Sequence, residues 1–282
     1  MRPLVVDAID RWRWAFGIIA KTHVRHLGAE YEIEAAPYHE LLAGRLWPPR
    51  RPDLLVVFWW PTAARLVEVL RPHRVLVCLF DGYSTRLPPA RAEFHRACAL
   101  GHVAVVNRGF ADRVPAGCPV SICEDAVDTS LFVPSPAPSA FTAGWVGNSD
   151  GAGSAGGPPD LKGLGLIRAA CARTGVRLVT QDLAVDGYRP HVEMPAWYSR
   201  VSAYVCASEC EGGPNPVLEA LACGRPVIST AVGLVPDLVR DGAPVTVVER
   251  SVGAIAGALR DLAGRSSEVI AAQALEARRV AL

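Results

Sequence analysis

Short runs of consecutive apolar residues alternate along the chain with longer stretches in which apolar residues recur at helical spacing. Apolar runs that predict strands occupy residues 4–7, 54–59, 75–79, 103–106, 141–146, 176–180, 203–207, 226–230 and 245–248. Stretches that predict helices occupy residues 16–27, 61–70, 161–173, 216–223 and 252–262. Continuous apolar strands that alternate with helices are typical of a parallel sheet buried on both faces. The pattern therefore predicts an α/β protein.

A proline-rich segment, residues 134–139 with the sequence PSPAPS, divides the chain almost in half. The alternation of strands and helices repeats on both sides of this segment. We therefore expect two Rossmann-like domains, residues 1–134 and residues 135–282, with parallel sheets that face each other across a cleft. Ligands of such sheets bind at the carboxyl ends of the strands.

Composition excludes several classes of protein. The formal net charge of +1 argues against nucleic acid as a partner, because a nucleic-acid-binding protein usually carries a basic footprint. The longest apolar run, residues 54–60, is far shorter than the roughly 20 residues of a spanning helix. Asp7 interrupts the first apolar run before a signal-peptide core can form. These features predict a soluble cytoplasmic protein.

No sequence feature predicts a metal site. The eight cysteines include no CxxC pair, and neither a DxD nor an HExxH motif occurs. Closely paired ligands are what a zinc site needs. We therefore expect reduced cysteines and metal-independent chemistry.

A glycine-rich segment leaves an oxidoreductase open as an alternative. Residues 151–156 match the GxGxxG pattern of dinucleotide-binding proteins, and Asp182 follows the next predicted strand. In such proteins, however, the glycines join the strand directly to the helix, so that a pyrophosphate meets the helix N-terminus. Here the pattern begins beyond Gly147, and two prolines delay the helix to about residue 161. An NAD-dependent oxidoreductase is therefore the weaker interpretation.

Residues 208–230 form the most informative segment. A loop rich in glutamate and glycine leads into a short predicted helix, with Asn215 as its N-cap, Pro216 at its first position and Gly224 at its end. The free N–H groups at such a helix start can bind an anion.

Charged residues flank this predicted anion site. Glu211 in the loop and Glu219 in the helix would approach one ligand from two sides, and carboxylates suit paired sugar hydroxyls. Lys162 stands at the start of another predicted helix, against the helix dipole. A diphosphate at that position would explain the lysine.

These motifs together resemble the family 4 glycosyltransferases, which are retaining enzymes with the GT-B fold. Their C-terminal domains carry the pattern E-G-x-P-x-x-x-x-E-A-x-A-x-G-x-P-V, and residues 211–227 read EGGPNPVLEALACGRPV. Gly147 with residues 162–164 is similar to the V-G…K-G element of the family. Residues 126–132 are similar to its crossover between domains.

The resemblance implies a retaining hexosyltransferase that moves a sugar from a nucleoside diphosphate sugar to a hydroxyl acceptor, which could be a glycan, a lipid or a small molecule. The donor would be UDP- or GDP-linked, with no cofactor and no metal. Lys162 and Glu211 would be the catalytic residues, and Glu219 would hold the ribose hydroxyls. The implied donor-binding residues are Gly147, Asn148, Lys162, Glu211, Gly212, Gly213, Pro214, Asn215 and Glu219.

The N-terminal half would bind the acceptor through loops at its strand ends. Candidate residues are Asp10, Arg11 and Trp12 after the first strand and Asp81 after the strand at 75–79. The aromatic face of Trp12 suits sugars and apolar acceptors, and Asp81 could orient an acceptor hydroxyl. The basic and aromatic residues 11–26 leave two alternatives open. They are a helix in peripheral contact with the inner face of an anionic membrane and a core helix with snorkelling arginines.

Two departures from the family pattern favour a second alternative, a sugar-nucleotide-binding protein that has lost transfer. Asn148 stands where an arginine is usual, so that Arg168 or Arg225 would have to supply the missing cation. The chain also ends about where family members continue into a final helix.

Overall fold

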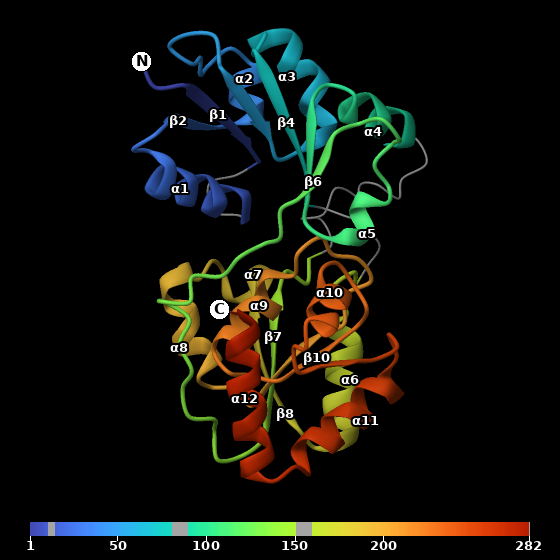
Figure 1. The fold of residues 1–282 in the computed structure, drawn as a ribbon. Coiled ribbons are helices and arrows are strands. Elements are labelled where there is room, and N and C mark those ends of the chain that lie inside the picture. The colour runs from blue at the N-terminus through green and yellow to red at the C-terminus, as the bar shows by residue number, and fades with distance from the viewer. Residues whose placement is uncertain (11–14, 81–89, 151–159, 282) are drawn as a thin grey trace. The chain divides into compact units, whose positions relative to one another are not determined.

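The computed structural model describes residues 1–10, 15–80, 90–150 and 160–281. Contacts divide the chain into two compact units, Met1–Glu124 and Asp125–Leu282 (Figure 1). The division falls before the boundary at residue 134 that the sequence predicts. The reason is that Phe132 is fully buried in the core of the second unit. Arg278 of that unit also donates hydrogen bonds to the carbonyl oxygens of Thr129 and Phe132.

The N-terminal unit contains a six-stranded parallel sheet in the order β2-β1-β3-β4-β5-β6. Its strands are β1 (Leu4–Ile9), β2 (Glu32–Pro37), β3 (Leu54–Val57), β4 (Arg74–Leu79), β5 (His102–Val105) and β6 (Val120–Ile122). Its helices are α1 (Ala15–Leu27), α2 (Tyr38–Leu42), the 3-10 turn η1 (Trp60–Thr62), α3 (Ala63–Leu70), α4 (Ala90–Cys98) and α5 (Arg108–Ala111).

The C-terminal unit contains a five-stranded parallel sheet in the order β11-β10-β9-β7-β8. Its strands are β7 (Thr142–Gly147), β8 (Arg177–Asp182), β9 (Ala203–Cys206), β10 (Val227–Ser229) and β11 (Val245–Val247). Its helices are α6 (Leu164–Thr174), α7 (Leu183–Asp186), the 3-10 turn η4 (His191–Glu193), α8 (Met194–Tyr198), α9 (Asn215–Ala222), α10 (Val235–Arg240), α11 (Val252–Ala263) and α12 (Ser267–Ala281). The prediction of an α/β fold with parallel sheets is confirmed.

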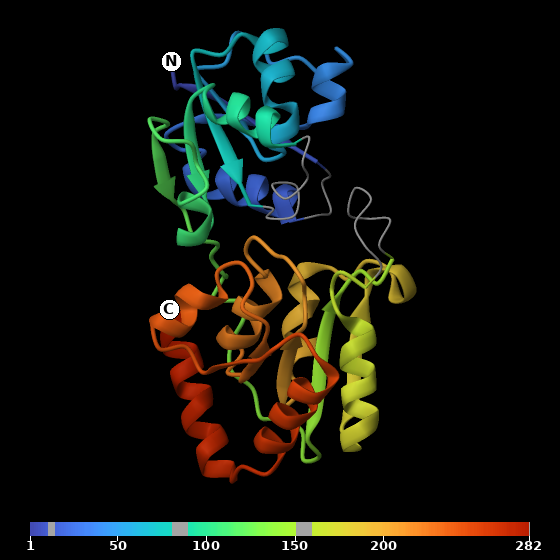
Figure 2. The same cartoon turned by 90° about the vertical axis from the view of Figure 1, so that its right-hand side faces the viewer.

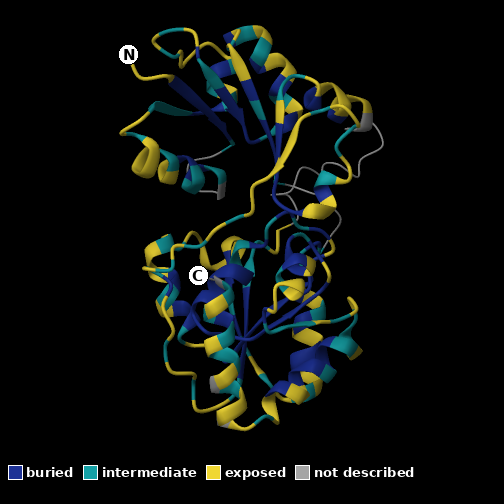
Figure 3. Cartoon of the chain, viewed as in Figure 1, coloured by how far each residue is buried: buried dark blue, intermediate teal, exposed yellow. Residues whose placement is uncertain are grey.

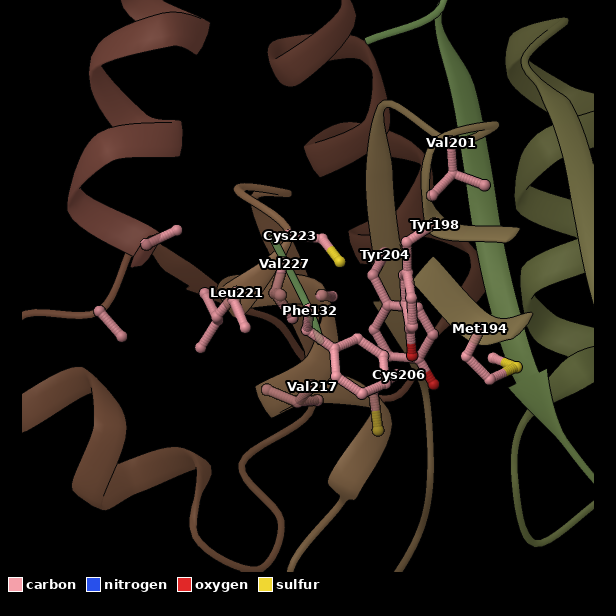
Figure 4. Close-up of a cluster of buried hydrophobic side chains, with 14 of the residues drawn as sticks. Phe132, Met194, Tyr198, Val201, Tyr204, Cys206, Val217, Leu221, Cys223 and Val227 are labelled. Carbon is pink, nitrogen blue, oxygen red and sulfur yellow. The ribbon is translucent and has the colours of Figure 1, made fainter. Parts of the chain in front are cut away.

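Helices cover both faces of the C-terminal sheet, and the strand residues alternate between two cores. Ala203 and Val205 of β9 pack in one cluster with α6 and α11, which lie side by side in Figures 1 and 2. Tyr204 and Cys206 of β9 pack in the other cluster with α8 and α9 (Figure 4). This double burial explains why β9 is apolar at successive positions. Figure 3 shows buried residues along the strands inside the C-terminal unit.

Every strand that the sequence pattern predicts is present, with ends that differ by a few residues. The pattern missed β2 and β6, which both lie at edges of the N-terminal sheet. Polar residues alternate with apolar ones in β2, and β6 is exposed throughout. Neither strand has the continuous apolar run of a central strand. No helix in the described ranges is long and apolar enough to cross a lipid bilayer.

Candidate functional site

Three side chains meet at the carboxyl ends of β7 and β9 in the C-terminal unit. The Nζ atom of Lys162 lies 2.6 Å from Oε1 of Glu211. The hydroxyl of Ser208, two residues beyond β9, donates a hydrogen bond of 2.6 Å to the same oxygen. Ser208 is buried and Glu211 is half-buried. This cluster joins a cation, a hydroxyl and a carboxylate at the end of the sheet where Rossmann-like domains bind ligands.

The backbone turn that carries Lys162 is held against β7 and β9. Gly163 has φ +70°, and a Cβ atom there would lie 2.2 Å from the carbonyl oxygen of Ala207, so that only glycine fits. The indole N–H of Trp145 donates to the carbonyl oxygen of Lys162 at 3.3 Å. The amide of Glu209 donates to the carbonyl oxygen of Leu161 at 2.9 Å. Lys162 therefore has a fixed position just before α6.

The start of α9 differs from the prediction. Asn215 is the first residue of the helix, and Pro214 occupies the N-cap position without a side-chain cap. The amide of Asn215 donates instead to the carbonyl oxygen of Gly213 at 2.9 Å. A Cβ atom at Gly233 would lie 2.1 Å from the carbonyl oxygen of Gly212. Close packing against Gly233 thus shapes the predicted donor-binding loop of Gly212, Gly213 and Pro214.

Glu219 is a buried acid in α9, with its carboxylate bound on both oxygens. Oε2 accepts a hydrogen bond of 2.8 Å from the hydroxyl of Tyr198, and Oε1 lies 3.1 Å from Nε2 of His191. Burial and the nearby Glu219 charge raise the pKa of Tyr198 well above its ordinary value, so its hydroxyl stays protonated and donates. The hydrogen bond with Glu219 raises the pKa of His191 against the opposing effect of burial.

Gly147 and Asn148 lie at the end of β7. Gly147 pairs with Asp182 of β8, and a Cβ atom at Gly147 would lie 2.6 Å from the ring of Trp145. The side chain of Asn148 accepts a hydrogen bond from the amide of Asp150 at 3.1 Å. Both predicted donor-binding residues therefore lie at the same end of the sheet as Lys162.

Asp182, the acid of the oxidoreductase alternative, has local backbone partners. Its Oδ1 accepts hydrogen bonds from the amides of Ser149 and Ala184 at 3.0 and 3.1 Å. Although burial acts to raise the pKa of Asp182, these hydrogen bonds lower it. The glycines at residues 151–156 lie outside the described residues.

The two arginines considered as substitutes for the missing cation have different surroundings. Arg225 is buried, and its guanidinium donates to the carbonyl oxygens of Tyr198 and Pro136 and to the hydroxyl of Ser135. This arrangement corrects the suggestion that Arg225 replaces the arginine of the family pattern. Arg168 is exposed on α6 and lowers the pKa of Asp182 by its charge.

Most of the residues that were predicted to bind the acceptor are not described by the structure. Arg11, Trp12 and Asp81 lie outside the described residues, whereas Asp10 is half-buried directly after β1. Within the parts of the chain that the structure describes, no group of His, Cys, Asp and Glu side chains could hold a metal ion.

Sequence reasoning missed Ser208, Tyr198 and His191. Ser208 could have been found, because it is the polar residue that ends an apolar strand before the acidic loop. Tyr198 and His191 precede Glu219 by 21 and 28 residues, and no spacing pattern links them to it. Folding of η4 and α8 against α9 brings them together.

Comparisons with known proteins agree with this architecture. Residues 167–265 match the family described as glycosyl transferases group 1. This match includes both Glu211 and Glu219, and it begins after Lys162. No curated protein matches the chain.

Several solved structures have a similar fold. Sucrose-phosphate synthase from Thermosynechococcus elongatus has a TM-score of 0.77 and 14% identity, over 100% of this chain and 94% of that one. Anabaena Alr3699/HepE in complex with UDP has a TM-score of 0.68 and 14% identity, with the same coverage. A glycosyltransferase from Rickettsia africae has a TM-score of 0.68 and 11% identity, over 99% of this chain and 93% of that one. The chain thus has the GT-B fold, and the resemblance to GT-B glycosyltransferases is confirmed.

Proposed function

We propose that this protein is a retaining glycosyltransferase that transfers a sugar from a nucleoside diphosphate sugar to a hydroxyl acceptor. The proposal is carried by one observation, the contact of Lys162 and Ser208 with Glu211 at the strand end that leads into α9. The group 1 match and the GT-B fold support a sugar-transfer function. The roles in binding the nucleotide and the sugar, and the retaining mechanism, are inferred from the chemistry of these side chains.

The diphosphate of the donor would bind between Lys162 and the start of α9. An ammonium group has three N–H donors, so Lys162 can keep its contact with Glu211 and still donate to a phosphate oxygen. The backbone N–H groups of residues 212–215 and of Gly147 would supply further donors, as helix starts do for anions. Two opposite unit charges 4 Å apart attract by about 4 kcal/mol at an effective dielectric constant of 20.

The nucleoside and the sugar would be held by the two carboxylates. Each carboxylate offers about four lone-pair sites, and Tyr198 and His191 contact the two oxygens of Glu219. The remaining sites of Glu219 can accept hydrogen bonds from ribose hydroxyls. Glu211 would accept a hydrogen bond from the donor sugar. UDP is the favoured nucleotide, because Alr3699/HepE, which has a similar fold, was solved with UDP and with UDP-glucose.

The acceptor would bind to the N-terminal unit, through Asp10, Arg11, Trp12 and Asp81. Helix α1 exposes Lys21 and Arg25 together with the apolar Leu27. A peripheral contact with an anionic membrane would form there.

In the transfer step, the bond between the anomeric carbon and the phosphate oxygen breaks, and the electron pair leaves with the phosphate. The acceptor oxygen forms its bond to the anomeric carbon on the same face of the sugar, and its proton passes to the departing phosphate. Lys162 and the N–H groups at α9 would stabilise the charge that develops on the leaving group. Positioning of the acceptor would supply the remaining acceleration.

Calorimetric titration with UDP, GDP, ADP and NADH tests the donor site. We expect one nucleoside diphosphate to bind the wild type and to bind Glu219→Ala much more weakly. Glu268→Ala, which removes an exposed acid in the first turn of α12, is the control and should bind like the wild type. Binding of NADH alone, unchanged by Glu219→Ala, would contradict the proposal.

Turnover and stereochemistry test the transfer itself. Sugars linked to the nucleotide that binds are screened for release of the diphosphate, and NMR of the product shows whether the anomeric configuration is retained. An inverted product would contradict the retaining mechanism. Binding without turnover of any donor would identify a sugar-nucleotide-binding protein instead.

A further inference from the structure

His191 lies against the ribose-binding carboxylate that the proposed function requires. It is the first residue of η4, and its Nε2 lies 3.1 Å from Oε1 of Glu219. The imidazole also packs against Phe132, with ring centroids 5.0 Å apart. Phe132 is fully buried in the cluster of Figure 4, next to Tyr198. Packing therefore fixes the ring of His191 while one edge faces the carboxylate.

The two partners of Glu219 act from different elements. Tyr198 of α8 donates to Oε2, and His191 of η4 faces Oε1. The Glu219 side chain is only 10% exposed, so water cannot easily replace either partner. Without a donor at Oε1, the carboxylate is held on one oxygen only and can rotate about its remaining contact with Tyr198. Such a rotation would move an acceptor that the ribose hydroxyls need.

We propose that His191 is a positioning residue for donor binding, which in its protonated form donates from Nε2 to Glu219 and holds that carboxylate in the orientation that receives the ribose hydroxyls. The inference rests on the proposed function, since it assigns a control to the same nucleotide site. If His191 acts in this way, the affinity for the nucleoside diphosphate depends on the protonation of its imidazole.

The charges around His191 favour the protonated ring. Glu219 faces it from α9, and Asp128 acts on it from the segment before Phe132. Tyr198 of α8 shares the carboxylate and stays neutral. On the segment of His191 itself, Arg189 donates to Gln181 and lies 3.9 Å from Glu193.

The hydrogen bond with Glu219, together with the charges of Glu219 and Asp128, raises the pKa of His191 although burial acts to lower it. A group with a raised pKa is protonated below that pKa and loses its proton as the pH rises through it. Charge-assisted hydrogen bonds are about twice as strong as neutral ones. The imidazolium also offsets the Glu219 charge near an anionic nucleotide. Both effects predict tighter binding at low pH.

The test measures the affinity for UDP by calorimetry from about pH 5.5 to about pH 8.5, the range in which histidine titrates. His191→Gln is the main variant, because glutamine keeps an N–H donor and has no charge that titrates. His102→Gln is the matched control, since His102 lies on β5 of the N-terminal unit. A phosphate group of UDP also takes up a proton near pH 6, but it contributes equally to every variant. Only the difference between variants reports on His191.

We expect the ratio of wild-type to His191→Gln affinity to be several-fold at low pH and to approach one at high pH. His102→Gln should follow the wild type throughout. A second variant, His191→Phe, keeps a ring next to Phe132 and removes the donor, and should bind about tenfold more weakly than His191→Gln at every pH.

Two negative results have different meanings. If the wild type binds UDP and the ratio of wild-type to His191→Gln affinity does not change with pH, the ring is only part of the scaffold and the inference is wrong. If the wild type binds none of UDP, GDP and ADP, the proposed function fails, and the inference fails with it.

Discussion

The Nζ atom of Lys162 lies 2.6 Å from Oε1 of Glu211, although 49 residues separate them in the sequence. The contact forms because β7 and β9 are neighbours in the sheet, and the segments that follow both strands begin at the same edge. Two sequence motifs, the lysine before α6 and the acidic loop before α9, therefore belong to one site. The lysine has a carboxylate partner, which keeps it at the position that we propose for the diphosphate.

Replacement of Lys162 by methionine should weaken the binding of UDP by about tenfold to a hundredfold, since a hydrogen bond to a charged group contributes about 1.5–3 kcal/mol. Calorimetry measures the change. Lys21→Met is the control, because Lys21 is the other lysine of the chain and is exposed on α1. Equal affinities of the wild type and Lys162→Met would show that the lysine serves only to neutralise Glu211.

Alanine at Gly163 should impair both stability and nucleotide binding. The left-handed conformation costs a non-glycine residue about 1–2 kcal/mol, and the new Cβ atom would lie 2.2 Å from the carbonyl oxygen of Ala207. Relief of that clash must move the turn that carries Lys162. We expect a large loss in the free energy of unfolding together with weaker UDP binding.

Gly175→Ala is the matched control for that variant. Gly175 has φ +72°, and nothing lies within 4 Å of its added Cβ atom. It should lose only the roughly 1–2 kcal/mol that the left-handed conformation costs alanine and should bind UDP like the wild type. Urea unfolding and calorimetry on both variants make the comparison. If both alanine variants bound equally well, the close approach of Gly163 to β9 would not matter for the site.

The parts of the site that could be predicted from the sequence are those encoded by neighbouring residues. Glu211 and Glu219 stand in one continuous motif, and the helix that carries Glu219 follows from proline placement and apolar spacing. Central strands such as β9 were predictable because both of their faces are buried. The edge strand β2 was not, because polar residues alternate along it.

The remaining features depend on how distant segments pack. Tyr198 and His191 reach Glu219 only after η4 and α8 fold against α9. Gly233 approaches Gly212 across the same end of the sheet. No local pattern encodes these contacts. The contact of Asp7 with His23 could be predicted only in part. The sequence shows an acid inside an apolar strand, but it does not show which residue pairs with that acid.

His23→Leu should destabilise the N-terminal unit. Oδ2 of Asp7 lies 2.9 Å from Nδ1 of His23, the Asp7 side chain is fully buried, and its Oδ1 has no hydrogen-bond partner among the described residues. Removal of the histidine leaves a buried carboxylate without this partner, and a buried polar group left unsatisfied costs about 1–3 kcal/mol. Urea unfolding measures the loss.

The double variant Asp7→Val/His23→Leu separates this explanation from a simple loss of packing. It removes the buried carboxylate together with its partner, and apolar replacements of a buried pair are often neutral. We expect the double variant to be more stable than His23→Leu alone. A double variant no more stable than His23→Leu would show that the loss comes from the packing of the His23 ring against Phe58 and not from the unpaired carboxylate.

Arg225→Met should destabilise the C-terminal unit and leave nucleotide binding unchanged. The guanidinium is buried and donates to the carbonyl oxygens of Tyr198 and Pro136 and to the hydroxyl of Ser135, so it ties the proline-rich segment to the end of α8. Its loss removes all three hydrogen bonds, which should lower the free energy of unfolding by about 1–3 kcal/mol.

Calorimetry and urea unfolding on Lys162→Met should give the opposite pattern, with weaker UDP binding and little loss of stability. Lys162 is partly exposed, and exposed ion pairs contribute only about 0–1 kcal/mol to stability. Calorimetry and urea unfolding on both variants therefore assign each cation to its role. A tenfold loss of UDP affinity in Arg225→Met at unchanged stability would instead place that arginine at the diphosphate. The hydrogen bonds of Arg225 to residues 135 and 136 argue against that outcome, since the guanidinium would have to release the segment that it holds.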